Sequence, residues 1–362
     1  MNAGGAIDPP HPMRVLIVRL DHLGDVLLTT PLVRAAVKAG NEVHVLVRES
    51  CATLFVENTG VTTHILEQVA PEFPRRWWRL GGWMRSGRYD MILLPHAKPP
   101  QLLLASALSG AGRRIAMWSG IFGRLTLHRC LRSGIRAGER HFSEMLLDCA
   151  REAGFPIDGS KPDFFLSAEE IEQARAEFAT RFPGLKVVGV HPGCAGNTCN
   201  LPSVTFGRVA EMLLEEPGLA VVASGVPAER PLFEAWPEAV LRHPRFYNAC
   251  GEWNLRQLAA HVANYSTMVV PSTGPLHIAA AYGIPTVTAF CRYPPVSATV
   301  WGNLTPGSVV LSPPAEFCNE RRSAPGSPHC DFEGKVKAEE LYRAVLQVLG
   351  LGAGVLPARP AN

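Results

Sequence analysis

The sequence predicts an α/β protein of two halves, each with a parallel β-sheet covered by helices. Three observations support this fold class. Short apolar runs rich in β-branched residues, typical of buried strands, alternate with longer segments of helical spacing. This series starts again near residue 186, after a break at Pro183 and Gly184. The length of 362 residues also suits two domains of ~150 residues each.

The first half begins with a βαβ unit. Residues 14–20 are an apolar run that predicts a strand, and residues 25–39 have helical spacing that ends at Gly40 and Asn41. Residues 42–47 resume as a strand. The other elements expected in this half are a strand at residues 90–95 and helices at residues 101–108, 141–153 and 169–181.

The second half repeats this alternation. The elements expected here are strands at residues 186–191, 219–224, 268–270 and 286–290 and helices at residues 204–215, 255–263, 276–282 and 338–349. We expect a first domain at residues 13–170 and a second at residues 183–335. Ligands of open parallel sheets bind beyond the carboxyl ends of the strands, so the site is expected among those loops, in a cleft between the halves.

The charge of the chain is unevenly distributed. The net charge is +3, but residues 70–140 contain thirteen Lys and Arg against three acidic residues. This excess favours an anionic partner for the segment. No apolar run approaches the ~18 residues that span a bilayer, and residues 1–12 lack the features of a secretory signal. A cytoplasmic protein is therefore expected, with most of its nine cysteines buried as small hydrophobic residues.

The strongest local motif is PSTGPLHIAAAYGIP at residues 271–285. Ser272, Thr273 and Gly274 form a turn after a strand, and a proline stands at the first helical position. The free N–H groups of a helix N-terminus bind anions, and a glycine lets the ligand approach the backbone. Thr273 adds a hydroxyl, and His277 lies about one turn further along. The alternative is a capped helix with a buried histidine and no ligand.

A second motif, Gly24 and Asp25, follows the first predicted strand. A carboxylate at a helix N-terminus stays ionised, so Asp25 can act as a general base at the mouth of the cleft. The alternative is that Asp25 caps the helix. Asp21 is a second candidate base, less well placed at the helix start. No GxGxxG motif follows this strand, which argues against a dinucleotide site there.

Two further loops follow strands of the second half. HPG at residues 191–193 contributes Gly193, and SGVPAE at residues 224–229 contributes Gly225 and Glu229. The carboxylate of Glu229 can bond a ribose hydroxyl. Each loop alone is a weak signal, because loops after strands are often rich in Gly and Pro. Together with the turn that precedes His277, they would surround one site.

These motifs resemble those of glycosyltransferase family 9, the heptosyltransferases of lipopolysaccharide core assembly. The stretch RVLIVRLDHLGDVLLTTPLVRAA (14–36), the HPG and Gly225 loops and STGPLHIAAAYGIPTV (272–287) match the family's motifs in order. The resemblance implies a GT-B fold of two Rossmann-like domains, with a last helix at residues 336–350 that packs back towards the first domain. It also implies heptose transfer from ADP-heptose with inversion, without a metal or other cofactor.

The resemblance also assigns roles to residues of this chain. Asp25 corresponds to the catalytic carboxylate, and the turn at residues 273–277 corresponds to the diphosphate site. Residues 251–255 correspond to the nucleotide loop, so Glu252 or Trp253 is expected near the adenine. The residues expected to bind the donor are Gly193, Gly225, Glu229, Glu252, Trp253, Ser272, Thr273, Gly274, Leu276 and His277.

The chain departs from the family pattern at two places. Members usually carry a basic residue after the HPG motif, but none occurs here from residue 192 to 207, which removes a charge-assisted bond worth roughly 1.5–3 kcal/mol. Ser272 stands where many members have Asp. These departures favour an alternative, a nucleotide-sugar-binding homologue with an altered donor or little catalysis. A sugar isomerase or epimerase is a third hypothesis, for which His96 is the candidate second acid–base group.

The basic segment suggests the partners. Residues 72–88 interleave five Arg with three Trp, a pattern that suits an anionic membrane surface or an acidic glycolipid acceptor. The alternatives are a solvated basic face and a nucleic-acid patch, but no nucleic-acid motif accompanies it. We expect a nucleotide-sugar donor, an anionic glycolipid acceptor, no nucleic acid, and a peripheral location at the cytoplasmic face of the inner membrane. The candidate acceptor-binding residues are His96, Lys98, Arg113 and Arg114.

Overall fold

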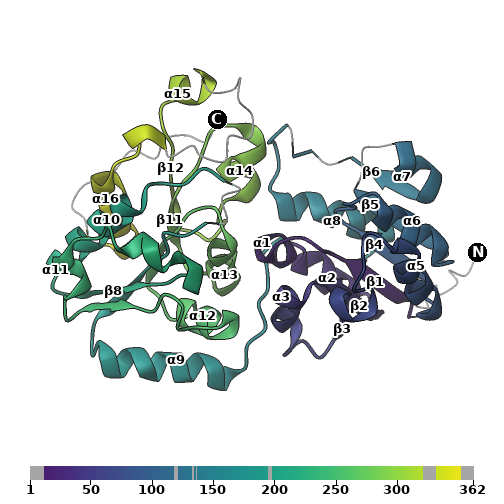
Figure 1. The fold of residues 1–362 in the computed structure, drawn as a ribbon, viewed down its shortest axis with the longest axis horizontal. Coiled ribbons are helices and arrows are strands. Elements are labelled where there is room, and N and C mark those ends of the chain that lie inside the picture. Colours follow the sequence, from purple (N-terminus) through teal and green to yellow (C-terminus); the bar gives the residue numbers. More distant parts are fainter. Residues whose placement is uncertain are drawn as a thin grey trace, which may run out of the picture.

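The computed structural model describes residues 12–117, 121–132, 134–135, 137–194, 198–320 and 332–351. It has two halves that lie side by side, each built around a six-stranded parallel sheet with flanking helices (Figure 1). The α/β fold class predicted from the sequence is confirmed. Within the described ranges, no helix is both long and apolar enough to cross a membrane.

The first sheet has the strand order β3-β2-β1-β4-β5-β6, which is that of a doubly wound Rossmann sheet. Successive residues of β1 face opposite sides: Val15 packs with helices α2 and α8, and Leu16 packs with α5 and α6. Its strands are β1 (Arg14–Val18), β2 (Glu42–Val47), β3 (Val61–Ile65), β4 (Met91–Leu94), β5 (Arg113–Met117) and β6 (Arg129–Leu131). Its helices are α1 (Leu23–Leu27), α2 (Thr30–Lys38), α3 (Glu49–Ala52), α4 (Leu66–Val69), α5 (Trp77–Ser86), α6 (Gln101–Leu108), α7 (Ile121–Thr126) and α8 (Phe142–Ala153).

The second sheet has the order β12-β11-β10-β7-β8-β9, so it repeats the topology of the first. Its strands are β7 (Lys186–Val190), β8 (Leu219–Ala223), β9 (Phe246–Asn248), β10 (Thr267–Val269), β11 (Thr286–Ala289) and β12 (Val309–Leu311). Its helices are α9 (Ala168–Arg181), α10 (Ser203–Glu215), α11 (Glu238–Leu241), α12 (Leu255–Val262), α13 (Gly274–Tyr282), α14 (Ala298–Trp301), α15 (Ala315–Glu320) and α16 (Ala338–Leu349).

The helix expected at residues 25–39 is divided into α1 and α2. Pro31 stands in the first turn of α2. A proline has no N–H to donate and is tolerated in a first turn but not in a helix interior. The short α1 therefore ends before the proline, and its own N-terminus remains next to the end of β1.

Helix α9 belongs with the second half. It begins with a capping box in which Ser167 and Glu170 bond each other's backbone N–H groups. It packs against α12, where Nδ2 of Asn264 donates to the carbonyl oxygen of Ile171 at 3.0 Å. The chain has therefore crossed to the second half before residue 168.

The last helix, α16, also stays with the second half. It packs against α10 and against β10, β11 and β12. Its buried side chains Leu341, Ala344 and Val345 share one helix face and lie in the core between α10 and the second sheet. Figure 1 shows α16 beside α10, away from the first half. The expectation that residues 336–350 pack back towards the first domain is therefore wrong for the part of the chain that the structure describes.

The two halves touch through α1 and α13. A Cβ atom on Gly24 would lie 2.8 Å from Cδ2 of His277, and one on Gly274 would lie 2.9 Å from Cδ2 of Leu23. Glycine at both positions therefore permits this close approach. A second contact places the ring of Phe142 4.5 Å from that of Trp301.

Candidate active site

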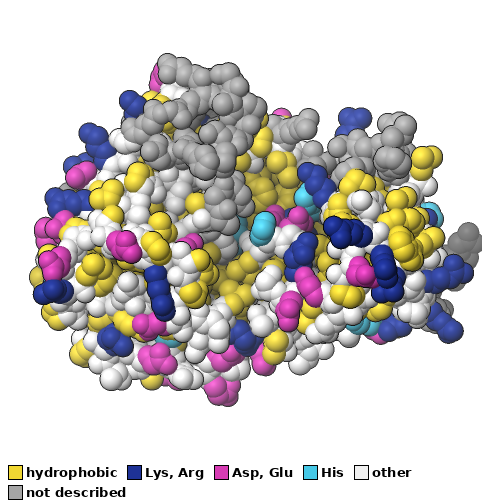
Figure 2. Space-filling model, viewed as in Figure 1, with side chains coloured by type: hydrophobic (Ala, Val, Ile, Leu, Met, Phe, Trp, Pro, Cys, Tyr) yellow, Lys and Arg dark blue, Asp and Glu magenta, His cyan; other side chains and the backbone are white. Residues whose placement is uncertain are grey.

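A cavity of about 860 Å³ lies between the halves. It is bounded by the loops that follow β1, β7, β8 and β10, where doubly wound sheets bind their ligands. Figure 2 shows hydrophobic side chains in the hollow between the halves, with histidine and acidic side chains nearby. The predicted site residues that line this cavity are Asp25, Gly193, Gly225, Glu229, Trp253, Ser272, Thr273, Gly274 and His277.

Asp25 lies in the first turn of α1, but it does not cap that helix. The N-cap residue is His22, and it makes no side-chain cap bond. The carboxylate of Asp25 accepts a hydrogen bond through Oδ1 from Nη2 of Arg19 at 2.9 Å. The other oxygen, Oδ2, has no hydrogen bond within the described residues. Asp25 is therefore fixed at the cavity wall with one oxygen available to a substrate.

Arg19 is a site residue that the sequence reasoning missed. Its side chain is only 2% exposed, and it pairs with Asp21 as well as Asp25. Burial raises the pKa of Asp21, but the hydrogen bond from His96 and the charge of Arg19 outweigh burial and lower that pKa below its ordinary value. The available signal was an arginine within the otherwise apolar run of residues 14–20.

His96 lies close to this ion pair, as part of a second cluster at the same edge of the sheet. Its Nδ1 atom is 3.0 Å from Oδ1 of Asp21. An adjoining cavity of about 680 Å³ is lined by Asp21, Arg48 and Lys98. The structure therefore places two of the four candidate acceptor residues, His96 and Lys98, around Asp21 and next to the main cavity.

The N-terminus of α13 forms the opposite wall. Thr273 is its N-cap residue, and the Oγ1 atom of Thr273 is buried without a hydrogen-bond partner in the described structure. His277 is 4% exposed, and its Nδ1 atom also lacks such a partner. Burial and the nearby charge of His141 lower the pKa of His277 to about 3, so the ring is neutral near pH 7. Two buried polar groups are thus left for a ligand.

Leu276 does not reach the cavity. Its side chain is fully buried in the core, and its N–H donates to the carbonyl oxygen of Thr273 at 3.1 Å. The assignment of Leu276 to the donor is therefore not supported by its position. Burial of this apolar side chain is favourable, and it also holds α13 in place.

The loops after β7 and β8 meet at Glu229. A Cβ atom on Gly193 would lie 2.0 Å from Oε1 of Glu229, so only glycine fits there. Oε2 of Glu229 accepts a hydrogen bond from the N–H of Val226 at 2.8 Å. Beside it, Nδ1 of His191 is 3.0 Å from Oγ of Ser224, and burial lowers the pKa of His191 to about 4. The carboxylate of Glu229 is thus held in place at the cavity wall.

Trp253 and Glu252 have different positions. Trp253 lines the cavity and stacks on His261 with ring centroids 3.8 Å apart. Glu252 does not line it, because its carboxylate accepts a hydrogen bond from the hydroxyl of Tyr247. Of the two residues expected near an adenine, the structure therefore brings Trp253 into the site and leaves Glu252 outside.

The family model of glycosyltransferase family 9 (heptosyltransferase) matches residues 136–323. This match covers more than half of the 362 residues. The chain belongs to glycosyltransferase family 9. The recognition made from the motifs is thereby confirmed, and the chain is a glycosyltransferase with the GT-B fold.

Three similar proteins show how far the likeness extends. A family 9 glycosyltransferase structure from Veillonella parvula is 19% identical, with a TM-score of 0.75, over 93% of this chain and 98% of that chain. The Escherichia coli ADP-heptose LPS heptosyltransferase II structure is 18% identical, with a TM-score of 0.72, over 93% and 99%. Lipooligosaccharide heptosyltransferase 2 of Haemophilus ducreyi is 23% identical over 318 residues, 83% of this chain and 88% of the relative.

The cavity between the halves of this family 9 glycosyltransferase has no Lys or Arg among its described lining residues. Arg208 pairs with Glu211 on α10. Arg256 contacts Glu170 and the carbonyl oxygen of Phe165. Neither arginine replaces the basic residue that is missing after the HPG motif. Residues 195–197 of the loop that follows this motif lie outside the described residues. The N-terminus of α13 contributes positive potential to this cavity.

Arg113 and Arg114 do not belong to an acceptor site of this glycosyltransferase. They begin β5, so they lie at the amino edge of the parallel sheet, opposite the cleft. Arg113 donates to the carbonyl oxygen of Glu152, and Arg114 donates to that of Thr126. Their assignment to the acceptor is wrong because net charge along a sequence does not distinguish the two ends of a strand.

Within the described residues, no group of three or more His, Cys, Asp and Glu side chains is arranged to hold a metal ion.

Proposed function

We propose that this family 9 enzyme is an inverting glycosyltransferase that moves heptose from ADP-heptose to a lipopolysaccharide-core or other cell-envelope glycan. One observation carries the proposal: the carboxylate of Asp25 and the N-terminus of α13 line the same cavity, one from each half. A base on one wall and an anion site on the other suit displacement of a nucleoside diphosphate by a sugar hydroxyl. The names of the Escherichia coli and Haemophilus relatives support this donor and acceptor class.

The reaction proceeds in one displacement. The acceptor oxygen bonds to the anomeric carbon as the bond from that carbon to the diphosphate oxygen breaks. The hydroxyl proton passes to Oδ2 of Asp25, since Oδ1 is held by Arg19. The charge that develops on the diphosphate is stabilised by the N–H group of Gly274 at the start of α13 and by the hydroxyl of Thr273. The configuration inverts because no covalent intermediate forms, and the scheme uses no metal.

The nucleotide is bound by the second half. The indole of Trp253 lines the cavity and gives the adenine a face to stack on. Glu229, also at the cavity wall, accepts hydrogen bonds from the ribose hydroxyls. The acceptor enters from the first half, where the cavity lined by Arg48 and Lys98 adjoins Asp21.

The enzyme works at the cytoplasmic face of a membrane, with α5 and its flanking arginines against anionic lipid. Trp78 of α5 is 52% exposed and Leu125 of α7 is 79% exposed. Arg75, Arg76 and Arg79 precede or lie on α5. Exposed apolar side chains beside arginines suit the interface of an anionic bilayer.

A second candidate function is that of a nucleotide-sugar-binding homologue with an altered donor or little catalysis. The absence of Lys and Arg from the described lining of the donor cavity favours it. One experiment separates the two functions. ADP, UDP and GDP are titrated calorimetrically into the protein, and transfer from ADP-heptose to a lipopolysaccharide-core acceptor is followed by mass spectrometry. The proposal expects ADP to bind most tightly and product to form; ADP binding without product supports the homologue, and preference for another nucleotide contradicts the donor.

A further inference from the structure

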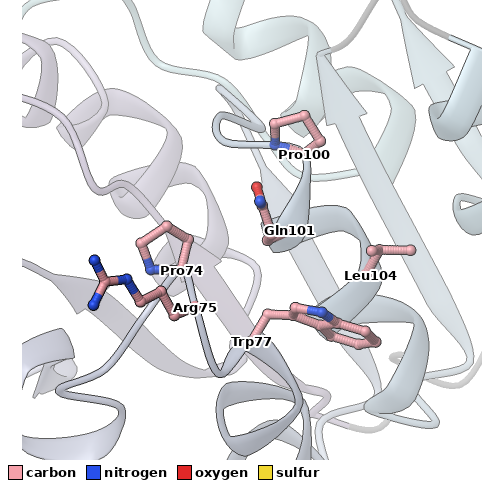
Figure 3. A pocket seen from close by; sticks show the side chains of 6 residues that line it. All are labelled: Pro74, Arg75, Trp77, Pro100, Gln101 and Leu104. Carbon is pink, nitrogen blue, oxygen red and sulfur yellow. The ribbon is translucent and has the colours of Figure 1, made fainter.

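A groove of about 380 Å³ lies on the first half, where the start of α5 approaches the start of α6. Figure 3 shows the indole of Trp77 near Leu104 and Gln101, with the guanidinium of Arg75 turned away from the indole. The groove is thus largely apolar inside, with one cation at its rim. Its lining residues are Pro74, Arg75, Trp77, Pro100, Gln101 and Leu104.

The arginine at the rim is available to an external anion. Arg76 and Arg79 both pair with Glu72. No carboxylate in the described part of the chain pairs with Arg75. An arginine beside an apolar groove complements a ligand that carries a phosphate next to a hydrocarbon chain.

The groove lies next to the proposed acceptor site. Pro100 lines both this groove and the cavity of Asp21 and Lys98. The carboxylate of Asp21 shares Arg19 with that of Asp25. A ligand that extends from the groove past Lys98 would thus approach Asp21, on the side of the ion pair where Asp25 lies.

We propose that the groove holds a hydrocarbon chain of a lipid-linked acceptor while Arg75 pairs with a phosphate of the same lipid. The inference rests on the proposed function and deepens it, because it makes the acceptor an amphiphile bound by its chain as well as its sugar. The side-chain oxygen of Gln101 is buried without a hydrogen-bond partner in the described structure. A chain that carries a hydroxyl or an amide N–H at this depth would satisfy that oxygen and would be preferred.

The test titrates n-alkyl phosphates of increasing chain length into the full-length protein, below the concentrations at which they form micelles. A buried CH₂ group contributes up to about fourfold in affinity, so affinity should rise with each carbon until the groove is full. Leu104→Trp fills the groove and should flatten this rise. Arg75→Gln should lower the affinity by a similar factor at every chain length. The matched control is Val204→Trp, at a side chain that is 52% exposed on α10 of the second half, and it should behave as the parent.

Several results would overturn the proposal. One such result is that the parent's affinity does not depend on chain length. Another is that the affinity of Leu104→Trp rises with chain length as it does in the parent. Equal affinity for inorganic phosphate and for alkyl phosphates would show anion binding without a chain site. Competition between alkyl phosphates and ADP would place the phosphate in the donor cavity instead of the groove.

Kinetic measurements test whether the bound hydrocarbon chain belongs to the acceptor. Leu104→Trp should raise the KM for a lipid-linked acceptor about tenfold, and kcat should stay the same. The KM for the same acceptor without its acyl chains should be unchanged. Equal effects on both acceptors, or on neither, would contradict the assignment. Failure of the proposed function is distinguishable, because transfer to the deacylated acceptor would then be missing in the parent as well.

Discussion

Arg19 determines how Asp25 is presented to the cavity. It is a buried guanidinium with two carboxylate partners, Asp21 and Asp25, and the ring of Phe142 lies 5.2 Å from it. A buried charge that is left without any partner is destabilising by about 3–5 kcal/mol. Each carboxylate is therefore held at the position where it faces Arg19, and Oδ2 of Asp25 keeps no hydrogen bond in the described structure.

Asp25→Asn should lower turnover by ~10²–10⁴, because the amide cannot accept the hydroxyl proton. Arg19 keeps Asp21 as its ionic partner, so the unfolding temperature should fall little. Turnover and thermal unfolding are measured on the variant and on Asp158→Asn, a control at an exposed ion pair with Lys38. Parental turnover in Asp25→Asn, or loss of its fold, would show that Asp25 is not the base.

Thr198 is the residue at which the missing cation can be restored. It lines the donor cavity, and its hydroxyl donates to the carbonyl oxygen of Ser272 at 3.4 Å. Thr198→Lys should tighten ADP binding at least tenfold, since a charge-assisted bond is worth roughly 1.5–3 kcal/mol. The control is Val204→Lys, at a side chain that is 52% exposed outside the cavity. If calorimetry shows the same ADP affinity in both variants, the diphosphate binds elsewhere.

At the scale of elements, the contact of α1 with α13 couples the base to the anion site. Gly24 and Gly274 permit this contact because a side chain at either position would meet the opposite helix. The two obstacles differ in kind: Gly274 faces the flexible end of Leu23, whereas Gly24 faces the buried ring of His277. The buried ring of His277 is harder to displace than the end of Leu23.

Gly24→Ala should therefore destabilise the protein by about 1–3 kcal/mol and lower turnover, because the new methyl group displaces His277 or α13. Gly274→Ala should have a smaller effect. The control is Gly82→Ala in α5, where a Cβ atom meets nothing within 4 Å and helix propensity favours alanine by up to ~1 kcal/mol. Urea unfolding and kinetics are measured on all three. Parental stability and turnover in Gly24→Ala would contradict the close approach.

Helix α5 carries the membrane prediction. Replacing Arg75, Arg76 and Arg79 by Glu should reduce binding to anionic vesicles at least tenfold, because each basic residue near such a surface contributes ~1 kcal/mol. ADP affinity should not change, since the nucleotide is proposed to bind the walls that the second half contributes to the cavity. A control with Arg175, Arg208 and Arg242 replaced by Glu carries the same charge change on the second half. Equal vesicle binding by the two variants would exclude α5 as the contact surface.

At the scale of the whole molecule, acid should destabilise the fold through buried histidines. Burial lowers the pKa of His191 to about 4 and that of His277 to about 3, whereas an unfolded histidine titrates near 6.5. The unfolded chain thus binds more protons below that pH. The stabilisation is complete above pH ~6.5 and decreases as the pH falls towards 4, by up to ~1.4 kcal/mol per pH unit for each histidine.

Urea unfolding from pH 7.5 to pH 5 measures this slope. His191→Asn removes one titrating group and should flatten the curve. His22→Asn is a control at an exposed side chain and should leave it as in the parent. A free energy of unfolding that stays constant down to pH 5 would contradict the burial of these neutral rings.

Most of the central strands could be predicted from the sequence, because strands buried on both faces are continuous apolar runs, as in β4 and β8. The edge strands β3, β6, β9 and β12 were missed, since an edge strand is short and partly exposed and its pattern is weak. In the site, Asp25 and the start of α13 were predictable because they follow strands at the switch points. The pairing of Arg19 and the burial of Leu276 were not, because both depend on contacts between segments far apart in the chain.

The position of α16 makes each half a continuous stretch of chain. Within the described residues, the polypeptide passes once between the halves, before α9, and α16 completes the second sheet's own core. A split of the coding sequence near residues 154–167 would yield two fragments, each with a whole sheet. The cavity needs both fragments, since Asp25 comes from one and Thr273 from the other. Reassembly of the two fragments would then be measured as recovered catalysis. Either fragment could also be exchanged for the corresponding fragment of a relative.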